Sequence, residues 1–160
     1  MTTTMTTVRA FEPSHVFRTL TRVGNLVMRP LIRSRLGRHM HELAVISFTG
    51  RKTGTRYAVP VGYQELDGQG LILTAAGWKA NLRGGANVEV VHDGRTRGMR
   101  ADLIEDADEV ADVYVALLQQ LGPKKAMKIG LKISGDHVPT HDELAHAVDG
   151  KRAVVRLGPR

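Results

Sequence analysis

The 160-residue sequence contains no cysteine, so disulfide bonds, cysteine-ligated zinc, iron–sulfur clusters and a thiolate nucleophile are excluded. Aromatic residues are also scarce, with three Phe, three Tyr and one Trp. Proteins that bind single-stranded nucleic acid usually stack its bases on aromatic side chains, so we expect no nucleic-acid partner. No stretch approaches about 18 consecutive apolar residues, and the sequence therefore predicts no membrane-spanning helix.

The sequence does contain an excess of positive charge. It has 23 Lys and Arg against 16 Asp and Glu, and its net charge is +7. This balance favours anionic partners, such as a phosphorylated or carboxylated cofactor, nucleic acid or an acidic membrane surface. Clustered cations with few aromatics fit an anionic cofactor better than they fit nucleic acid. The cations gather between Arg18 and Arg56, with a second group at Lys124, Lys125, Lys128 and Lys132.

The N-terminal part of the chain has two segments. Its threonine-rich start lacks the apolar stretch of a secretory signal, so we expect a disordered tail over residues 1–13 and a cytoplasmic protein. Ser14 then precedes apolar residues at three- and four-residue steps, which predicts an amphipathic helix over residues 14–35 with a kink near Pro30. The helix has a basic face, and two interpretations stay open: it packs on the sheet only, or it also makes peripheral contact with an anionic membrane.

From Leu43 onward, short β-rich runs alternate with glycine-containing turns. This pattern is typical of an antiparallel meander, and Asp93-Gly94 is typical of a tight hairpin turn. We expect a mainly β member of the α+β class, a barrel-like sheet in one domain over residues 14–160. The predicted strands cover residues 43–48, 56–63, 70–75, 87–92 and 95–104.

The C-terminal third predicts helices and one more strand. Asp106 is a suitable N-cap for a helix that runs to about Leu121, where Gly122-Pro123 ends it. Residues 140–148 predict a short capped helix, and residues 152–157 a strand that returns to the sheet. The histidines of this region are interpreted as solvated surface groups, so no metal site is predicted.

The most informative segment is the turn from Ser47 to Arg56, which combines two glycines, three cations and three threonines. Glycines let the backbone expose N–H groups in a concave nest, and nearby cations add positive charge, so such a turn can hold phosphate. The spacing is not that of a Walker loop. The alternative is an ordinary soluble hairpin loop.

A second segment runs from Ala75 to Arg83. Small residues at a strand end allow a flat ring to approach the backbone, and Trp78 follows them as a wall for such a ring. Lys79 and Arg83 would meet an acidic tail. The alternative is a core tryptophan at a barrel corner.

Together these motifs resemble the deazaflavin-dependent nitroreductase family. The resemblance extends from Arg18 to Pro159 and rests on the following residues: Thr49-Gly50-Arg51-Lys52-Thr53-Gly54, Arg56, Val59-Pro60, Gly77-Trp78, Asn81-Leu82, Asn87-Val88-Glu89-Val90 and the strand of residues 152–159. It implies a split β-barrel of the flavin-reductase type that binds coenzyme F420, a deazaflavin with a phosphate and an oligoglutamate tail.

The resemblance also implies site residues. Arg51, Lys52, Thr53 and Arg56 would hold the phosphate and tail, while Pro60, Ala75, Ala76, Gly77 and Trp78 would border the ring. The complete predicted cofactor site comprises Gly50, Arg51, Lys52, Thr53, Gly54, Arg56, Pro60, Ala75, Ala76, Gly77, Trp78, Lys79, Asn81 and Arg83.

The expected activity is hydride transfer between F420 and an apolar or conjugated small molecule, as in a nitroreductase. Such chemistry needs no metal or nucleophile, because the cofactor carries the reaction and the protein orients it. Tyr63 and Tyr114 are the candidate proton donors. The alternatives are a non-enzymatic carrier of a lipid or other apolar ligand and an FMN- or haem-binding barrel. The sequence leaves a homodimer open.

Overall fold

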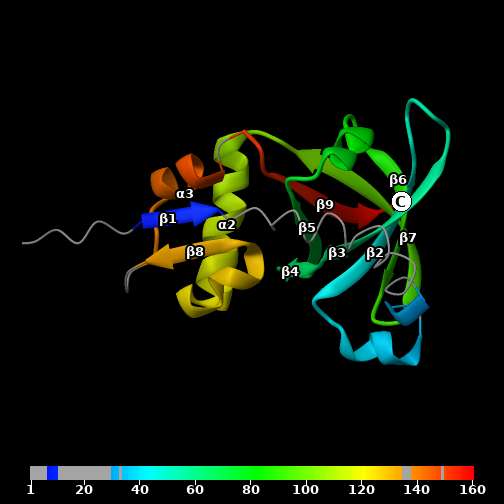
Figure 1. Cartoon of the computed structure of the whole chain (residues 1–160), viewed down its shortest axis with the longest axis horizontal. Helices are drawn as coiled ribbons and strands as arrows, with labels where there is room; N and C mark the ends of the chain where they lie inside the picture. Colours follow the sequence, from blue (N-terminus) through cyan, green and yellow to red (C-terminus); the bar gives the residue numbers. More distant parts are fainter. Residues whose placement is uncertain (1–6, 11–29, 33, 135–137, 149) are drawn as a thin grey trace, which may run out of the picture. The chain divides into compact units, whose positions relative to one another are not determined.

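The computed structural model describes residues 7–10, 30–32, 34–134, 138–148 and 150–160 (Figure 1). The chain divides into two compact units, one made of Met1–Glu12 and Ile104–Val154 and the other of Pro13–Leu103 and Val155–Arg160. We describe each unit by itself, and the prediction of a single domain stays a prediction. In chain order the elements are β1 (Thr7–Ala10), η1 (Arg35–His39), β2 (Leu43–Thr49), β3 (Arg56–Gly62), β4 (Gln64–Leu66), β5 (Gln69–Thr74), η2 (Gly77–Leu82), β6 (Ala86–His92), β7 (Arg95–Ile104), α2 (Ala107–Leu121), η3 (Pro123–Ile129), β8 (Leu131–Ser134), α3 (His141–Val148) and β9 (Ala153–Pro159).

The larger sheet has seven strands in the order β3-β2-β6-β7-β9-β5-β4 (Figure 1). Its two edge strands, β3 and β4, are separated in the chain only by Tyr63. A sheet whose two edges are joined through one residue has to curl, and β3 indeed contacts β5 near the other edge. The sheet therefore forms a half-barrel, which confirms the predicted fold class, mainly β within α+β.

Side chains of β2 point alternately to the two faces of this sheet, and each face carries its own hydrophobic cluster. Ala44, Ile46 and Phe48 belong to the cluster inside the half-barrel, together with Val88, Val90, Val155 and Leu157. Val45 faces the other way and packs with Ile32 and Val91. Because side chains alternate with period two, the register between β2 and β3 decides which face each site residue takes.

The predicted hairpins are present. Asp67-Gly68 and Asp93-Gly94 each have positive φ at both residues, at 51° and 77° and at 51° and 69°. Positive φ at both central positions defines the type I′ turn, whose twist matches that of paired strands. The first of these turns connects β4 and β5. The short strand β4 thus lies between the predicted strand over residues 56–63 and this turn.

The helices of the first unit begin and end where the sequence predicts. The carboxylate of Asp106 accepts the backbone N–H groups of Asp108 and Glu109 and so caps α2. Thr140 and Glu143 form a reciprocal capping box at the start of α3, since each side chain accepts the other residue's backbone N–H. The face that α2 buries includes Val110, Tyr114, Leu117 and Leu118.

Three strands were not predicted, namely β1, β4 and β8. β1 pairs with β8 in a separate two-stranded antiparallel sheet, with Thr7 opposite Ser134 and Ala10 opposite Leu131. The prediction of disorder over residues 1–13 is therefore wrong for Thr7–Ala10. Four-residue strands lack a clear pattern of their own, and their partners lie almost at opposite ends of the chain. The predicted helix over residues 14–35 lies mostly outside the described residues. Within its range, Pro30, Leu31 and Ile32 are described and are helical.

Candidate functional site

The turn between β2 and β3 is held closed by its own backbone. The N–H of Gly50 donates to the carbonyl of Thr55 at 2.8 Å, and the N–H of Gly54 donates to the carbonyl of Gly50 at 2.9 Å. Gly54 has φ at 65°, a conformation that favours glycine. The hydroxyl of Thr53 accepts the N–H of Thr55 at 3.2 Å. Each of these contacts fixes the shape of the turn without a ligand.

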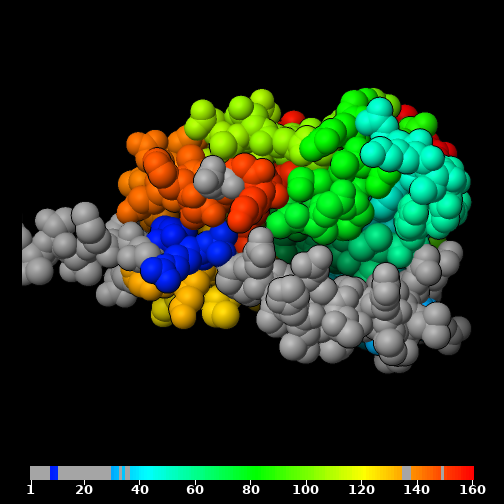
Figure 2. All heavy atoms as spheres, turned by 45° about the horizontal axis from the view of Figure 1, so that its top comes forward, coloured from blue at the N-terminus to red at the C-terminus, as the bar shows by residue number. Residues whose placement is uncertain are grey.

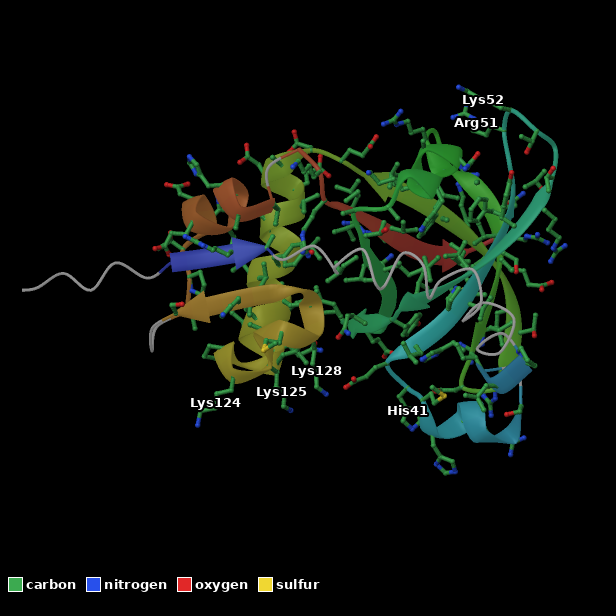
Figure 3. All side chains as sticks on the ribbon, in the orientation of Figure 1. His41, Arg51, Lys52, Lys124, Lys125 and Lys128 are labelled. Atoms are coloured by element: carbon green, nitrogen blue, oxygen red, sulfur yellow. The ribbon has the colours of Figure 1, made fainter. Side chains whose placement is uncertain are left out.

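Two N–H groups of this turn have no partner among the described residues, those of Lys52 and Thr53. They are consecutive and exposed, and the Lys52 ammonium group follows them. The predicted anion nest therefore narrows to these two N–H groups and one cation. Figure 3 shows Lys52 beside Arg51 at the tip of the hairpin, directed away from the ribbon.

Asn81 ties this turn to η2. Its Oδ1 accepts the backbone N–H of Arg51 at 3.0 Å, and its Nδ2 donates to the carbonyl of Trp78 at 2.9 Å. The guanidinium of Arg51 adds a second link, because it donates to the carbonyl of Arg83 at 2.9 Å. The two segments that the sequence singled out are thus side by side on the surface of this unit (Figure 2).

An aromatic row lies between these two segments. The ring of Phe48 stacks on Trp78, with centroids 5.5 Å apart and planes at 24°. Its other neighbour is Tyr57, whose ring centroid lies 5.8 Å away at 30°. Phe48 is buried, whereas Tyr57 is 40% exposed and its hydroxyl lies 3.3 Å from that of Thr53. The row runs from the core toward the cation-bearing turn.

Small residues leave open space beside Trp78. Ala75, Ala76 and Gly77 are exposed, and a Cβ atom added at Gly77 would meet no atom within 4 Å. Packing within the protein therefore does not require glycine at position 77. At Gly50, by contrast, an added Cβ would lie 2.6 Å from Oγ1 of Thr53 and 2.7 Å from Cε2 of Tyr57. A side chain at Gly50 would thus have to displace Thr53 or Tyr57, whereas the surface at Gly77 is open.

Three further cations belong to these two segments, namely Lys52, Lys79 and Arg83. Lys52 and Arg83 are exposed and Lys79 is half-buried at the start of η2. In the described part of the chain, neither Lys52 nor Lys79 makes a hydrogen bond or ion pair through its amine. Their charge is therefore not neutralised by the residues that surround them.

Arg56 and Pro60 take the opposite face of the sheet. Pro60 pairs with Val45, which packs in the outer cluster, whereas Tyr57 pairs with Phe48 inside. Arg56 forms an ion pair with Glu89 at 3.2 Å. The structure thus does not bring these two predicted site residues together with Trp78. Pro60 also lies on the edge strand β3. Proline has no backbone N–H, and at the edge of a sheet this absence costs no hydrogen bond to a neighbouring strand.

The structure separates Tyr63, one of the candidate proton donors, from the turn. Its backbone N–H donates to the carbonyl of Glu42 at the far end of the β2–β3 hairpin. Eight residues separate Tyr63 from Thr55 in the turn, which at 3.3 Å per residue is roughly 25 Å along the strand. Its ring stacks on His92 with centroids 3.8 Å apart. Burial, with a smaller contribution from the charge of Glu65, raises the pKa of its phenol. Tyr63 is a core residue at the barrel's bend.

Tyr114, the other candidate, belongs to the other unit. It is fully buried in α2, and Nη1 of Arg152 donates to its hydroxyl at 3.1 Å. Burial raises the pKa of this phenol, and the opposing effect of Arg152 is smaller. These contacts describe a packed helix residue. A role for Tyr114 in proton transfer stays a prediction.

Sequence reasoning missed Phe48 and Tyr57 as members of the site. The signal that would have found them is the hairpin itself. Phe48 and Tyr57 lie two residues outside the Gly50–Thr55 closure and face each other across the two strands. The sequence contains three Phe, three Tyr and one Trp, and one of each gathers in this row.

A family model described as F420H(2)-dependent quinone reductase matches residues 23–133. No curated protein matches the sequence. The described residues hold no cluster of three or more His, Asp or Glu that could bind a metal ion, and none of their helices is long and apolar enough to cross a membrane.

Solved structures give weaker likenesses. An F420-H2 dependent reductase has 15% identity and a TM-score of 0.46, over 72% of this chain and 93% of that chain. A structure described as a domain-swapped dimer has 14% identity and a TM-score of 0.48, over 90% and 99%. An FAD and haem binding protein from Mycobacterium smegmatis has 16% identity and a TM-score of 0.46, over 82% and 66%. With TM-scores below 0.5, these likenesses carry no argument about function.

Proposed function

Because the chain belongs to the F420H(2)-dependent quinone reductase family, and is accordingly an oxidoreductase that uses coenzyme F420, we propose that its acceptor is a quinone or a similar conjugated, apolar molecule. The aromatic row supports this proposal, since flat conjugated rings stack favourably on aromatic side chains.

One observation carries the assignment of the site, the pair of hydrogen bonds made by Asn81. They join the cation-bearing turn to the segment that carries Trp78, so a ligand with an anionic tail and a flat ring can engage both. Neither segment alone distinguishes a cofactor site from a soluble loop or a core tryptophan. The two hydrogen bonds of Asn81 keep the segments next to each other, as a ligand with both chemical parts would require.

The residues present fit coenzyme F420. The two consecutive N–H groups of Lys52 and Thr53, with the ammonium groups of Lys52 and Lys79, are donors suited to phosphate and carboxylate. The open side of Gly77 and the exposed Ala75 and Ala76 suit a planar ring. When bound in its reduced form, F420 supplies a hydride to the acceptor.

The protein's own contributions are orientation, water exclusion and access to a proton. Trp78, supported from behind by the buried ring of Phe48, would present an apolar wall to the ring and exclude water from that side. A quinone that accepts a hydride also takes up one proton at oxygen to become a hydroquinone. Tyr57 is the only phenol of the aromatic row, and its hydroxyl lies beside that of Thr53. Tyr57 is exposed and Tyr63 is buried, so Tyr57 is the better candidate to donate this proton.

Titration with F420 and FMN tests the cofactor site. We expect F420 to bind more tightly than FMN, because the cations would meet glutamates that FMN lacks. The change Lys52→Gln should weaken F420 binding and flatten its salt dependence. Arg56→Gln should have a smaller effect, since its guanidinium is shared with Glu89. Equal or absent F420 binding would favour the carrier or the FMN-binding alternative.

Asn81→Ala tests the link between the two segments. It removes two hydrogen bonds that contribute about 1 kcal/mol each, so we expect F420 binding to weaken by up to about 30-fold with the fold retained. Asn87→Ala, at an exposed asparagine of β6, is the matched control. If both variants bind F420 equally well, the two segments do not act as one site.

Substrate class is tested by following oxidation of F420H2 with a soluble naphthoquinone and with a nitroaromatic compound. We expect faster turnover with the quinone. Faster turnover with the nitroaromatic compound would contradict the proposed acceptor without affecting the cofactor assignment.

Several related predictions stay proposals. We place the enzyme in the cytoplasm. Peripheral membrane contact through residues 14–35 concerns a segment mostly outside the described residues. A homodimer also stays a proposal.

A further inference from the structure

The short helix η3 exposes an unusual surface. In a 3-10 helix, residues three apart lie on the same face. Ala126 and Ile129 form one such pair and are buried. The other two faces carry Lys124 with Met127 and Lys125 with Lys128, and all four residues are exposed. Two of the three faces of η3 thus point outward and carry only cations and one long apolar side chain.

Met127 is the most exposed large apolar side chain among the described residues, at 67%. Single exposed apolar residues are common in proteins, so Met127 alone indicates nothing. Here it lies among lysines, and the amines of Lys124 and Lys125 make no hydrogen bond or ion pair with the described residues. Figure 3 shows Lys124, Lys125 and Lys128 close together on η3.

The neighbouring two-stranded sheet adds to this charge. Arg9 of β1 lies directly opposite Lys132 of β8, and both are exposed. Like charges placed opposite each other destabilise a strand pair, unless an anion lies near them. Since β8 contacts η3, all of these cations lie in one region of this unit. We call Arg9, Lys124, Lys125, Met127, Lys128 and Lys132 the η3 patch.

The acidic residues of α2 are too far away to cancel this charge. Asp106 lies just before the helix and Asp108, Glu109 and Asp112 lie in its first half, whereas η3 follows its end. A helix of 15 residues is about 22 Å long, and charges are screened over about 8 Å at physiological ionic strength. The acidic residues of α2 therefore screen little of the positive charge of the η3 patch.

We propose that the η3 patch docks on an anionic lipid surface, with Met127 inserted among the acyl chains and the lysines at the phosphate groups. This inference does not depend on the proposed acceptor. Nucleic acid and acidic proteins would also attract the lysines. An exposed methionine surrounded by lysine ammonium groups on flexible stems fits the boundary between headgroups and acyl chains, where one side chain is buried and its neighbours stay in water.

Co-sedimentation of the full chain with vesicles tests this proposal. The vesicles contain phosphatidylglycerol and phosphatidylcholine in equal parts, or phosphatidylcholine alone. We expect binding to the anionic vesicles only. Each lysine near such a surface contributes roughly a fivefold change in partitioning, so Lys124→Gln with Lys125→Gln should lower binding about 25-fold. Met127→Ser should lower it several-fold, and its effect should persist in high salt.

A matched control separates the patch from overall charge. Arg95→Gln with Lys151→Gln removes two exposed cations elsewhere, and this variant should bind like the parent. Circular dichroism confirms that each variant is folded. The proposal is overturned if the parent does not bind anionic vesicles, or if the control loses as much binding as the patch variant. It is equally overturned if Met127→Ser has no effect while the lysine changes abolish binding to duplex DNA, because nucleic acid would then be the partner.

Discussion

At the scale of single residues, the site depends on side chains that contact protein more than on those that face solvent. Asn81 uses both ends of its amide within the chain, and Arg51 uses its N–H and its guanidinium. Both residues were expected to contact the cofactor. We propose that they also act as positioning residues, because these hydrogen bonds hold the turn that carries Lys52 next to the segment that carries Trp78.

Trp78 provides a test at this scale. Trp78→Ala removes the wall of the open space and one partner of Phe48, and an aromatic pair contributes roughly 0.5–1.5 kcal/mol beyond its buried area. We therefore expect several-fold weaker F420 binding. Trp78→Phe keeps an apolar ring and should retain much of the affinity. If both variants are folded and bind F420 as the parent does, Trp78 does not border the ring, whatever quenching of its fluorescence is observed.

Tyr114 leads to a prediction about pH. Burial raises the pKa of its phenol above the ordinary value of 10.0, so the folded state favours the neutral form. Below about pH 10 the phenol is protonated in both states and its contribution to stability is complete. As the pH rises through and above 10, the unfolded chain ionises first, and the free energy of unfolding falls.

Urea unfolding between pH 8 and pH 11 measures this effect. Tyr114→Phe should be less stable at pH 8, because the hydrogen bond from Arg152 is lost, but its stability should fall less steeply in alkali. Parallel curves for the parent and the variant would show that the phenol does not titrate differently on folding.

At the scale of elements, short-range chemistry determines the ends of helices and hairpins. The two type I′ turns need residues that tolerate positive φ, and Asp-Gly supplies them. The cap of α2 needs a side-chain oxygen that accepts hydrogen bonds one residue before the helix, and Asp106 supplies it. Each device acts within about four residues of the chain, so it is visible in the sequence.

Asp106→Ala tests the cap. The carboxylate accepts two backbone N–H groups at 3.1 and 3.0 Å, and loss of an N-cap destabilises a protein by about 1 kcal/mol. We expect a lower midpoint of thermal unfolding for Asp106→Ala and little change for Asp106→Asn, whose amide oxygen also caps. An equal loss in both variants would indicate that the negative charge, rather than the hydrogen bonds, stabilises α2.

At the scale of the whole molecule, the net charge of +7 affects how an anionic ligand arrives. Long-range attraction raises association rates, and salt screens it within about 8 Å at physiological ionic strength. We expect the association rate constant of F420 to fall with added salt more steeply than that of FMN, which has fewer negative charges. Stopped-flow fluorescence measures both rates, and equal salt slopes would contradict a role for the protein's field.

The sequence alone determined the local structure and the chemical character of the protein. Period-two runs with glycine turns predict the antiparallel strands, and the capped apolar repeat predicts α2, because these signals act between neighbouring residues. The absence of cysteine and the excess of cations exclude whole classes of chemistry on composition alone. The motifs around Gly50 and Trp78 also predicted the family, since each is a short contiguous pattern.

Only the tertiary structure decided which residues meet. The pairing of β1 with β8 joins distant parts of the chain, and four-residue strands carry too little pattern to reveal their partners. The row of Tyr57, Phe48 and Trp78 and the bonds of Asn81 depend on how the half-barrel brings η2 to the hairpin. Arg56 and Pro60 fall on the other face because side chains alternate along a strand, and the register sets which of them point inward.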